Sequence, residues 1–179
     1  MEEINVTTPV ITPRSTGVRY GVINGVIGIA YFIILMAADI DMSQGFGRWG
    51  STLIAIVLVF LAHKYYKENG DGYMTYGQGV GIGFWMGLVG SVISSVFTYI
   101  YAKFIDPTFI TTIREKAISD MEAQGQSQQQ IDAAMKFVEM FTSAEALLFF
   151  GLFFGTLILV VIALIISIFT QKPQPETSI

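Results

Sequence analysis

Four long apolar segments, separated by polar stretches that carry turn signals, dominate the sequence. They cover about residues 17–38, 46–66, 76–101 and 144–169. At a rise of about 1.5 Å per residue, a helix of this length crosses a hydrocarbon core of about 30 Å. The pattern therefore predicts an all-α membrane protein, with a four-helix transmembrane domain over residues 17–169 between polar tails at 1–16 and 170–179.

The second apolar segment needs support from its flanks. Its strictly apolar run, residues 52–62, is short, and runs of roughly 10 to 14 residues are also typical of re-entrant or interfacial segments. Phe46 and Trp49 precede the run and Tyr65 follows it, as in the aromatic belts that mark membrane interfaces. We therefore expect the segment from 46 to 66 to cross the membrane.

The polar interval between the third and fourth segments, residues 107–141, has helical periodicity of its own. Apolar residues recur at helical spacing on both sides of Gly125. Asp106 is expected to cap the first helix, Ser127 and Gln130 to form a capping box at the second, and Thr142 to begin one for the fourth span. We predict a short two-helix amphipathic insertion, which could lie on the membrane, cover the mouth of the bundle or pack on itself.

Small residues recur every four positions in three of the four predicted spans. Such stripes let helix backbones approach closely in lipid, where van der Waals packing holds helices together. The spacing of the glycines in the third span fits neither dinucleotide nor phosphate-loop motifs, so we interpret the stripes as helix-packing faces. Their members are Gly17, Gly21 and Gly25; Gly79, Gly83, Gly87, Ser91 and Ser95; and Gly151 and Gly155.

Asn24 is the most distinctive polar residue at membrane depth. A buried amide must find a partner, so an interhelical hydrogen bond is the favoured role and contact with a substrate or ion is the alternative. Ser91, Ser94, Ser95 and Thr98 can donate hydrogen bonds to carbonyls of their own helix, which would leave them without a functional role.

Composition and charge narrow the function classes. Hydrophobic residues make up 53% of the chain and charged residues 13%, a balance that requires a lipid environment. Cysteine is absent, which removes disulfides, thiolate metal sites and cysteine nucleophiles. The ten basic residues are scattered, so we expect no nucleic-acid partner. Basic residues beside the helix ends on the side of the termini favour cytoplasmic termini.

Candidate catalytic and metal-binding residues are few. His63 is the single histidine and lies beside an aromatic belt, where an interfacial role is the default and a base or metal ligand the alternative. Asp39, Asp41 and Asp106 fall near helix ends on one side and could gather a divalent cation, although caps and rim charges are the default. We predict no enzyme activity, no metal and no cofactor.

Three segments resemble the bacterial domain of unknown function 4199 family. They are YMTYGQGVGIGF at 73–84, FTYIYAKFIDP at 97–107 and QGQSQQQI at 124–131. The resemblance extends from about Arg14 to Phe169. It implies a small four-helix protein of the bacterial inner membrane and supplies no activity, cofactor or catalytic residue.

The sequence leaves two main roles open and, as a third, a membrane enzyme, which would show converging titratable groups. The first is a structural or interaction subunit whose partners are the lipid bilayer and either a second copy or another membrane protein. The alternative is a small transporter or lipid-handling protein with a groove between the glycine-rich helices. A continuous polar cavity around Asn24 would distinguish the alternative from the subunit.

Overall fold

Helices form nearly all of the protein that can be described. The computed structural model describes residues 11–42 and 45–175, and within these ranges the only strand-like pairing is an isolated antiparallel bridge between Met74 and Lys172. The elements are α1 (Pro13–Ala37), α2 (Gly45–Asn69), α3 (Tyr76–Ile100), a π-helical turn η1 (Tyr101–Ile105), α4 (Phe109–Ala123), α5 (Gln128–Phe141) and α6 (Ala144–Thr170).

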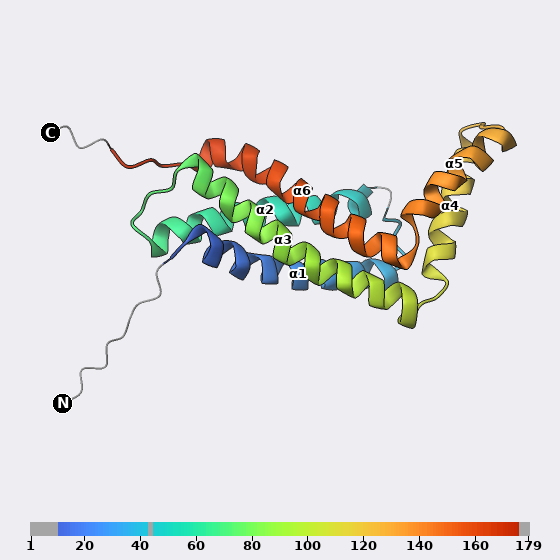
Figure 1. The fold of residues 1–179 in the computed structure, drawn as a ribbon, viewed down its shortest axis with the longest axis horizontal. Helices are drawn as coiled ribbons and strands as arrows, with labels where there is room; N and C mark the ends of the chain where they lie inside the picture. Colours follow the sequence, from blue (N-terminus) through green and yellow to red (C-terminus); the bar gives the residue numbers. More distant parts are fainter. Residues whose placement is uncertain (1–10, 43–44, 176–179) are drawn as a thin grey trace, which may run out of the picture.

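Four of these helices are long and apolar enough to cross a membrane. They are α1, α2, α6 and the continuous segment Tyr76–Ile105, which joins α3 to η1. The short helices α4 and α5 form a hairpin that extends beyond one end of the bundle (Figure 1). The all-α membrane fold with four spans and a two-helix insertion, predicted from the sequence, is confirmed.

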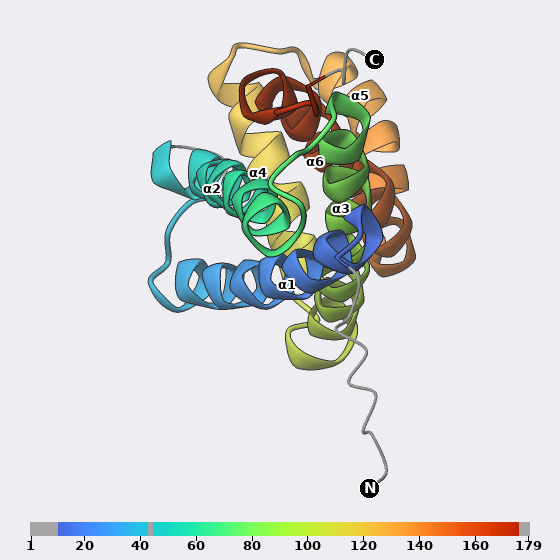
Figure 2. The same cartoon turned by 90° about the vertical axis from the view of Figure 1, so that its left-hand side faces the viewer.

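The third span is the centre of the bundle. Helix α3 packs extensively against α1 and against α6, whereas α2 makes smaller contacts with α1, α6 and α3. Figure 2 shows α1 and α6 on either side of α3, with α2 set apart from α3. One consequence is that the backbone of α2 lies close to the other helices over less of its length than the other spans do.

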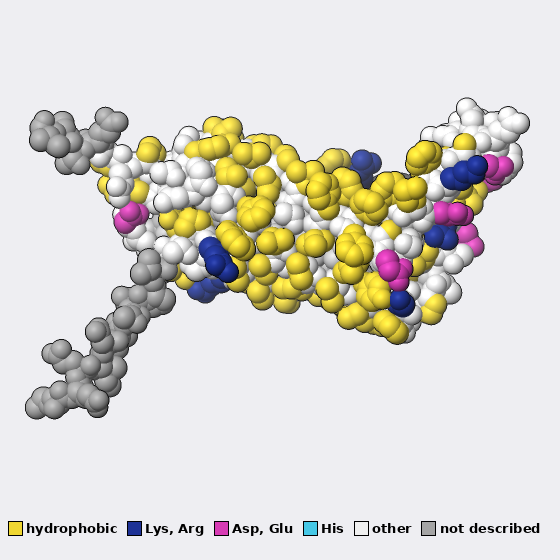
Figure 3. All heavy atoms as spheres, viewed as in Figure 1, with side chains coloured by type: hydrophobic (Ala, Val, Ile, Leu, Met, Phe, Trp, Pro, Cys, Tyr) yellow, Lys and Arg dark blue, Asp and Glu magenta, His cyan; other side chains and the backbone are white. Residues whose placement is uncertain are grey.

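Side chains on the outside of the bundle match a lipid environment. Large hydrophobic residues of the spans are exposed, among them Val26, Leu53, Phe153 and Phe169. Figure 3 shows hydrophobic side chains covering the side of the bundle, with charged groups near its ends and on the α4–α5 hairpin. An exposed apolar surface of this extent is stable in a bilayer and would aggregate in water.

Several helix ends differ from the expected positions. Helix α1 starts at Pro13, ahead of the expected residue 17, because Thr12 caps it by accepting a hydrogen bond from the amide of Ser15. The predicted capping box at Ser127 is confirmed, since Gln130 Oε1 accepts a hydrogen bond of 2.8 Å from the Ser127 amide. Local caps therefore decide where these helices begin.

Two predicted caps are wrong. The cap of α6 is Ser143, because the Thr142 hydroxyl donates to the carbonyl of Val138 and accepts from Arg114 instead. Asp106 does not begin α4, which starts at Phe109. Its carboxylate accepts hydrogen bonds from the amide and hydroxyl of Thr108 and forms a turn ahead of the helix.

Candidate functional site

Glycines on α1 let large side chains of α3 pack directly against its backbone. A Cβ atom at Gly17 would lie 2.5 Å from Trp85 Cβ, and one at Gly21 would lie 2.8 Å from Val89 Cβ. Gly25 lies against Ile93 in the same way. These glycines therefore set the distance between α1 and α3, since any side chain would push the two helices apart.

The α3–α6 interface is built from two reciprocal sets of small residues. In its first half, α3 supplies the glycines against which α6 side chains pack. A Cβ atom on three of its glycines would meet an α6 side chain, at 2.5 Å for Gly79 and Ser167 Oγ and at 2.9 Å for Gly87 and Leu159 Cβ, while Gly83 lies against Ala163. In its second half α6 supplies them, as Gly151 faces Ser95 and Gly155 faces Ser91.

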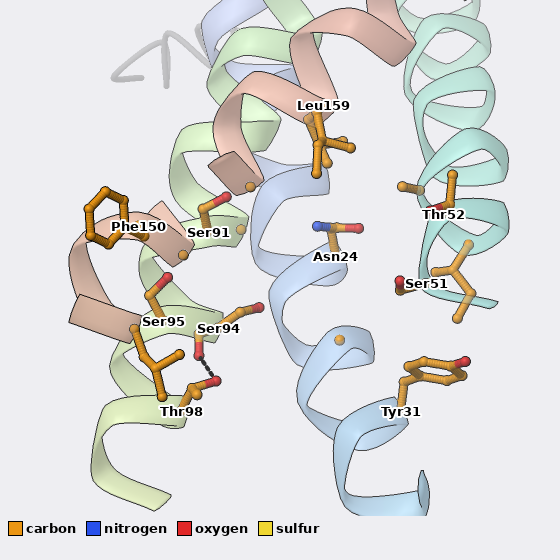
Figure 4. Close-up of a pocket in the computed structure, with 18 residues that line it drawn as sticks. Asn24, Tyr31, Ser51, Thr52, Ser91, Ser94, Ser95, Thr98, Phe150 and Leu159 are labelled. Carbon is orange, nitrogen blue, oxygen red and sulfur yellow. Dashed lines mark hydrogen bonds between the residues drawn. The ribbon is translucent and has the colours of Figure 1, made fainter. Parts of the chain in front are cut away.

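A cavity of about 400 Å³ lies among the four spans, and we call it the four-span cavity. Residues from α1, α2, α3 and α6 line it (Figure 4). It lies toward the end of the bundle that carries α4 and α5, because its lining comes from the C-terminal halves of α1 and α3 and the N-terminal halves of α2 and α6. Its polar lining residues are Asn24, Tyr31, Ser51, Thr52, Ser91, Ser94, Ser95 and Thr98.

Most polar groups around Asn24 lack partners. Thr98 donates a hydrogen bond of 3.0 Å to the carbonyl of Ser94, as the sequence suggests (Figure 4). The hydroxyls of Ser91 and Ser95 make no such bond within the described chain, although these residues are only 7% and 4% exposed. The Asn24 amide lies against Gly90 of α3 and likewise forms no hydrogen bond among the described residues. Unpaired polar groups in an apolar setting cost free energy, which a bound polar group would recover.

The lining of the four-span cavity carries no net charge. None of its lining residues is Asp, Glu, Lys, Arg or His. Transfer of an ion into such surroundings would carry a large desolvation cost without a counter-charge to offset it. The cavity therefore suits an uncharged group that can both donate and accept hydrogen bonds.

His63 lies near the end of α2, and its side chain is buried between helices, a role that the sequence did not predict. Its ring is 0% exposed; Nδ1 lies 2.8 Å from Thr170 Oγ1 and Nε2 lies 3.0 Å from the carbonyl oxygen of Gly79. The histidine thus joins α2 to α3 and α6 at the end opposite the four-span cavity. Sequence reasoning misses this role because both partners are distant in the chain.

The three aspartates considered as cation ligands line a second cavity of about 580 Å³, between the α1–α2 connection and α4. Asp41 Oδ2 lies 2.8 Å from Lys116 Nζ, and this hydrogen bond raises the pKa of the lysine. Asp106 is engaged by Thr108. Within residues 11–42 and 45–175, no three acidic or histidine side chains are grouped so that they could hold a metal ion.

Comparison with known proteins gives one match. Residues 19–172 match a family described as “Protein of unknown function (DUF4199)”. No curated protein and no solved structure matches the chain. The match covers all four spans and the insertion, apart from the first residues of α1.

Proposed function

We propose that this chain, which belongs to the DUF4199 family of proteins of unknown function, is a membrane protein that binds an uncharged ligand in the four-span cavity. The observation that carries the proposal is the polar cavity around Asn24, into which the amide of Asn24 and the hydroxyls of Ser91 and Ser95 open without a hydrogen bond to other described residues. The sequence favours a structural or interaction subunit. A polar cavity around Asn24 is the feature that would distinguish a transporter or lipid-handling protein from such a subunit. Pockets of about 300 to 1,000 Å³ are typical of ligand sites.

The proposed role is binding without catalysis. A hydroxyl nucleophile needs a neighbouring base, and the lining of the four-span cavity offers serines and threonines without a histidine, carboxylate or amine beside them. We accordingly propose no cofactor and no metal for this site. The ligand would be held by hydrogen bonds to the amide and hydroxyls and by contact with Phe150 and Leu159.

Filling the four-span cavity tests the proposal. Thr52 lines the cavity from α2, and its neighbour Leu53 is 58% exposed on the outside of the same helix. We expect Thr52→Phe to remove the molecule that co-purifies with the wild-type protein, while the matched variant Leu53→Phe keeps it. Native mass spectrometry of the detergent-released protein measures the bound mass. Equal loading of all three proteins, or an empty wild type, would contradict the proposal.

We also propose that the protein lies in the inner membrane of a bacterium with both termini in the cytoplasm. The resemblance to the DUF4199 family supports the location in the bacterial inner membrane. Arg14, Arg19, Lys64, Lys67 and Lys172 support the orientation, because they flank helix ends on the side of the termini, where positive charge favours the cytoplasm.

Cysteine labelling checks this orientation, since the chain has no cysteine of its own. Gln124 is exposed at the hairpin between α4 and α5, and Gln174 is exposed after α6. In spheroplasts, we expect an impermeant maleimide to label Gln124→Cys. We expect it to label Gln174→Cys only after the inner membrane is permeabilised. The reverse pattern would invert the topology, and labelling of both from outside would show that α6 does not cross the membrane.

A second role, as an interaction subunit, is supported by the α4–α5 hairpin. The hairpin projects beyond the bundle (Figure 1). Its residues Phe137 and Met140 are exposed. A second copy of the chain or another membrane protein is the partner that this surface suits. This role is compatible with ligand binding in the four-span cavity, because the two features use different residues.

A further inference from the structure

We infer that the ligand is an uncharged lipid whose headgroup carries hydroxyl or ester groups, and that it enters the four-span cavity from the bilayer between α2 and α6. This inference rests on the proposed function, because it concerns the same cavity. It adds the chemical class of the ligand and its route.

The unpaired polar groups define the headgroup. Asn24 offers two donors and one acceptor, and the hydroxyls of Ser91 and Ser95 each offer one donor and accept as well. A glycerol hydroxyl or an ester carbonyl satisfies such groups. A phosphate would bring a charge into a lining that has no lysine or arginine to pair with it. The lining therefore favours neutral lipids over phospholipids.

The edge of the cavity between α1 and α2 is closed. The Tyr31 hydroxyl donates a hydrogen bond of 2.6 Å to the carbonyl of Phe46 at the start of α2. Gly50 lies directly against the Tyr31 ring, where any side chain would collide with it. A ligand therefore has no path between these two helices without breaking this contact.

The edge between α2 and α6 is open to lipid. Ile158 of α6 lines the four-span cavity and is also 51% exposed, and Ser51 of α2 lines it and is exposed. Figure 4 shows Ser51 and Thr52 of α2 across the cavity from Phe150 of α6. Both helices are candidate spans, so this opening faces the hydrocarbon region of the bilayer.

The packing of α2 explains why the opening lies at one end. Its C-terminal half is buried through Leu58, Val59, Ala62 and His63, whereas near its start Ser51 and Leu53 are exposed. The helix is thus packed against α3 and α6 through its C-terminal half, whereas near its start it contacts α1 through Gly50. A cavity of about 400 Å³ suits a headgroup, so the acyl chains of a bound lipid would remain in the surrounding bilayer.

Photo-crosslinking of the full-length protein in vesicles tests the lipid class and the route. Vesicles would contain a trace of photoactivatable diacylglycerol in one sample and photoactivatable phosphatidylglycerol in the other, with adducts mapped by peptide mass spectrometry. We expect diacylglycerol to label the peptides lining the four-span cavity more than about tenfold over phosphatidylglycerol, a ratio set by the cost of burying its charge. Asn24→Leu should reduce that labelling, whereas Ser167→Ala, which alters a buried hydroxyl outside the cavity, should not.

Other outcomes overturn the inference and remain distinguishable from failure of the proposed function. Equal or stronger cavity labelling by phosphatidylglycerol would reject a neutral lipid while leaving ligand binding in place. Adducts confined to outward-facing residues such as Phe153 and Phe169 would reject lipid entry. If mass spectrometry on the Thr52→Phe series identifies a water-soluble molecule, the lipid class fails although the cavity remains a binding site.

Discussion

Gly83→Ala is expected to destabilise the protein, and adding Ala163→Gly to the same chain is expected to restore most of the loss. A Cβ atom at Gly83 would collide with the Cβ of Ala163, so one methyl group fits at this point of the α3–α6 interface and two do not. Overpacking of this kind typically costs about 1 to 3 kcal/mol. The double variant moves the methyl from α6 to α3 and keeps the packed volume unchanged.

The measurement is the thermal midpoint of the four proteins of this cycle in detergent. Gly77→Ala is the matched control, because no atom lies within 4 Å of a Cβ at that glycine on the same helix. It should be neutral, or stabilising by up to about 1 kcal/mol through helix propensity. If the two substitutions at positions 83 and 163 act additively, α3 and α6 do not meet at these residues, and the packing described above is incorrect.

The sequence is sufficient to predict the spans and their close-packing faces, because both are local properties of the chain. The length and apolarity of residues 144–169 require a spanning helix whatever its neighbours are. A glycine repeat likewise indicates close contact, but it does not name the partner. Nothing in the sequence shows that Gly83 meets α6 or that Gly21 meets α3.

The candidate site can be predicted from the sequence only in part. Asn24 stands out because an amide is rare at membrane depth. The serines near it are able to bond to their own helix, yet Thr98 alone among the four residues of that set behaves in this way. The cavity itself is lined by residues of all four spans, so its existence depends on how the four helices pack together.

Helix caps show a similar limit. The sequence pattern at Ser127 is sufficient to predict the cap of α5, because no distant residue among those described competes for its partners. At Thr142 the pattern fails, since Arg114 donates a hydrogen bond of 2.9 Å to its hydroxyl. Glu145 lies three residues after Thr142, where a capping box needs an acidic or amide side chain, but it pairs with Lys103 instead, at 2.9 Å. Where the local sequence allows two alternative caps, competing tertiary partners therefore decide which cap forms.

His63 gives the second large effect. We expect His63→Leu to lower the free energy of unfolding by about 1 to 3 kcal/mol, because it leaves the Gly79 carbonyl without its side-chain donor and removes one of the two partners of the Thr170 hydroxyl. Since the carbonyl can only accept, Nε2 carries a hydrogen. In the neutral ring Nδ1 is then an acceptor, and the single hydrogen of the Thr170 hydroxyl is shared between Nδ1 and the carbonyl of Ile166, which lies 2.9 Å away.

A graded series separates this network from simple loss of volume. His63→Gln keeps an amide donor within reach of the Gly79 carbonyl, so its thermal midpoint should fall between those of the wild type and His63→Leu. Thr170→Val removes the hydroxyl while conserving shape, and it should cost little more once His63 is already leucine. The control is Lys64→Gln, which removes an exposed ion pair with Glu68 worth at most about 0.5 kcal/mol. Two outcomes would show that the buried histidine does not hold α2 to α3 and α6. One is additive losses of thermal stability at positions 63 and 170, and the other is a loss at position 64 as large as that at position 63.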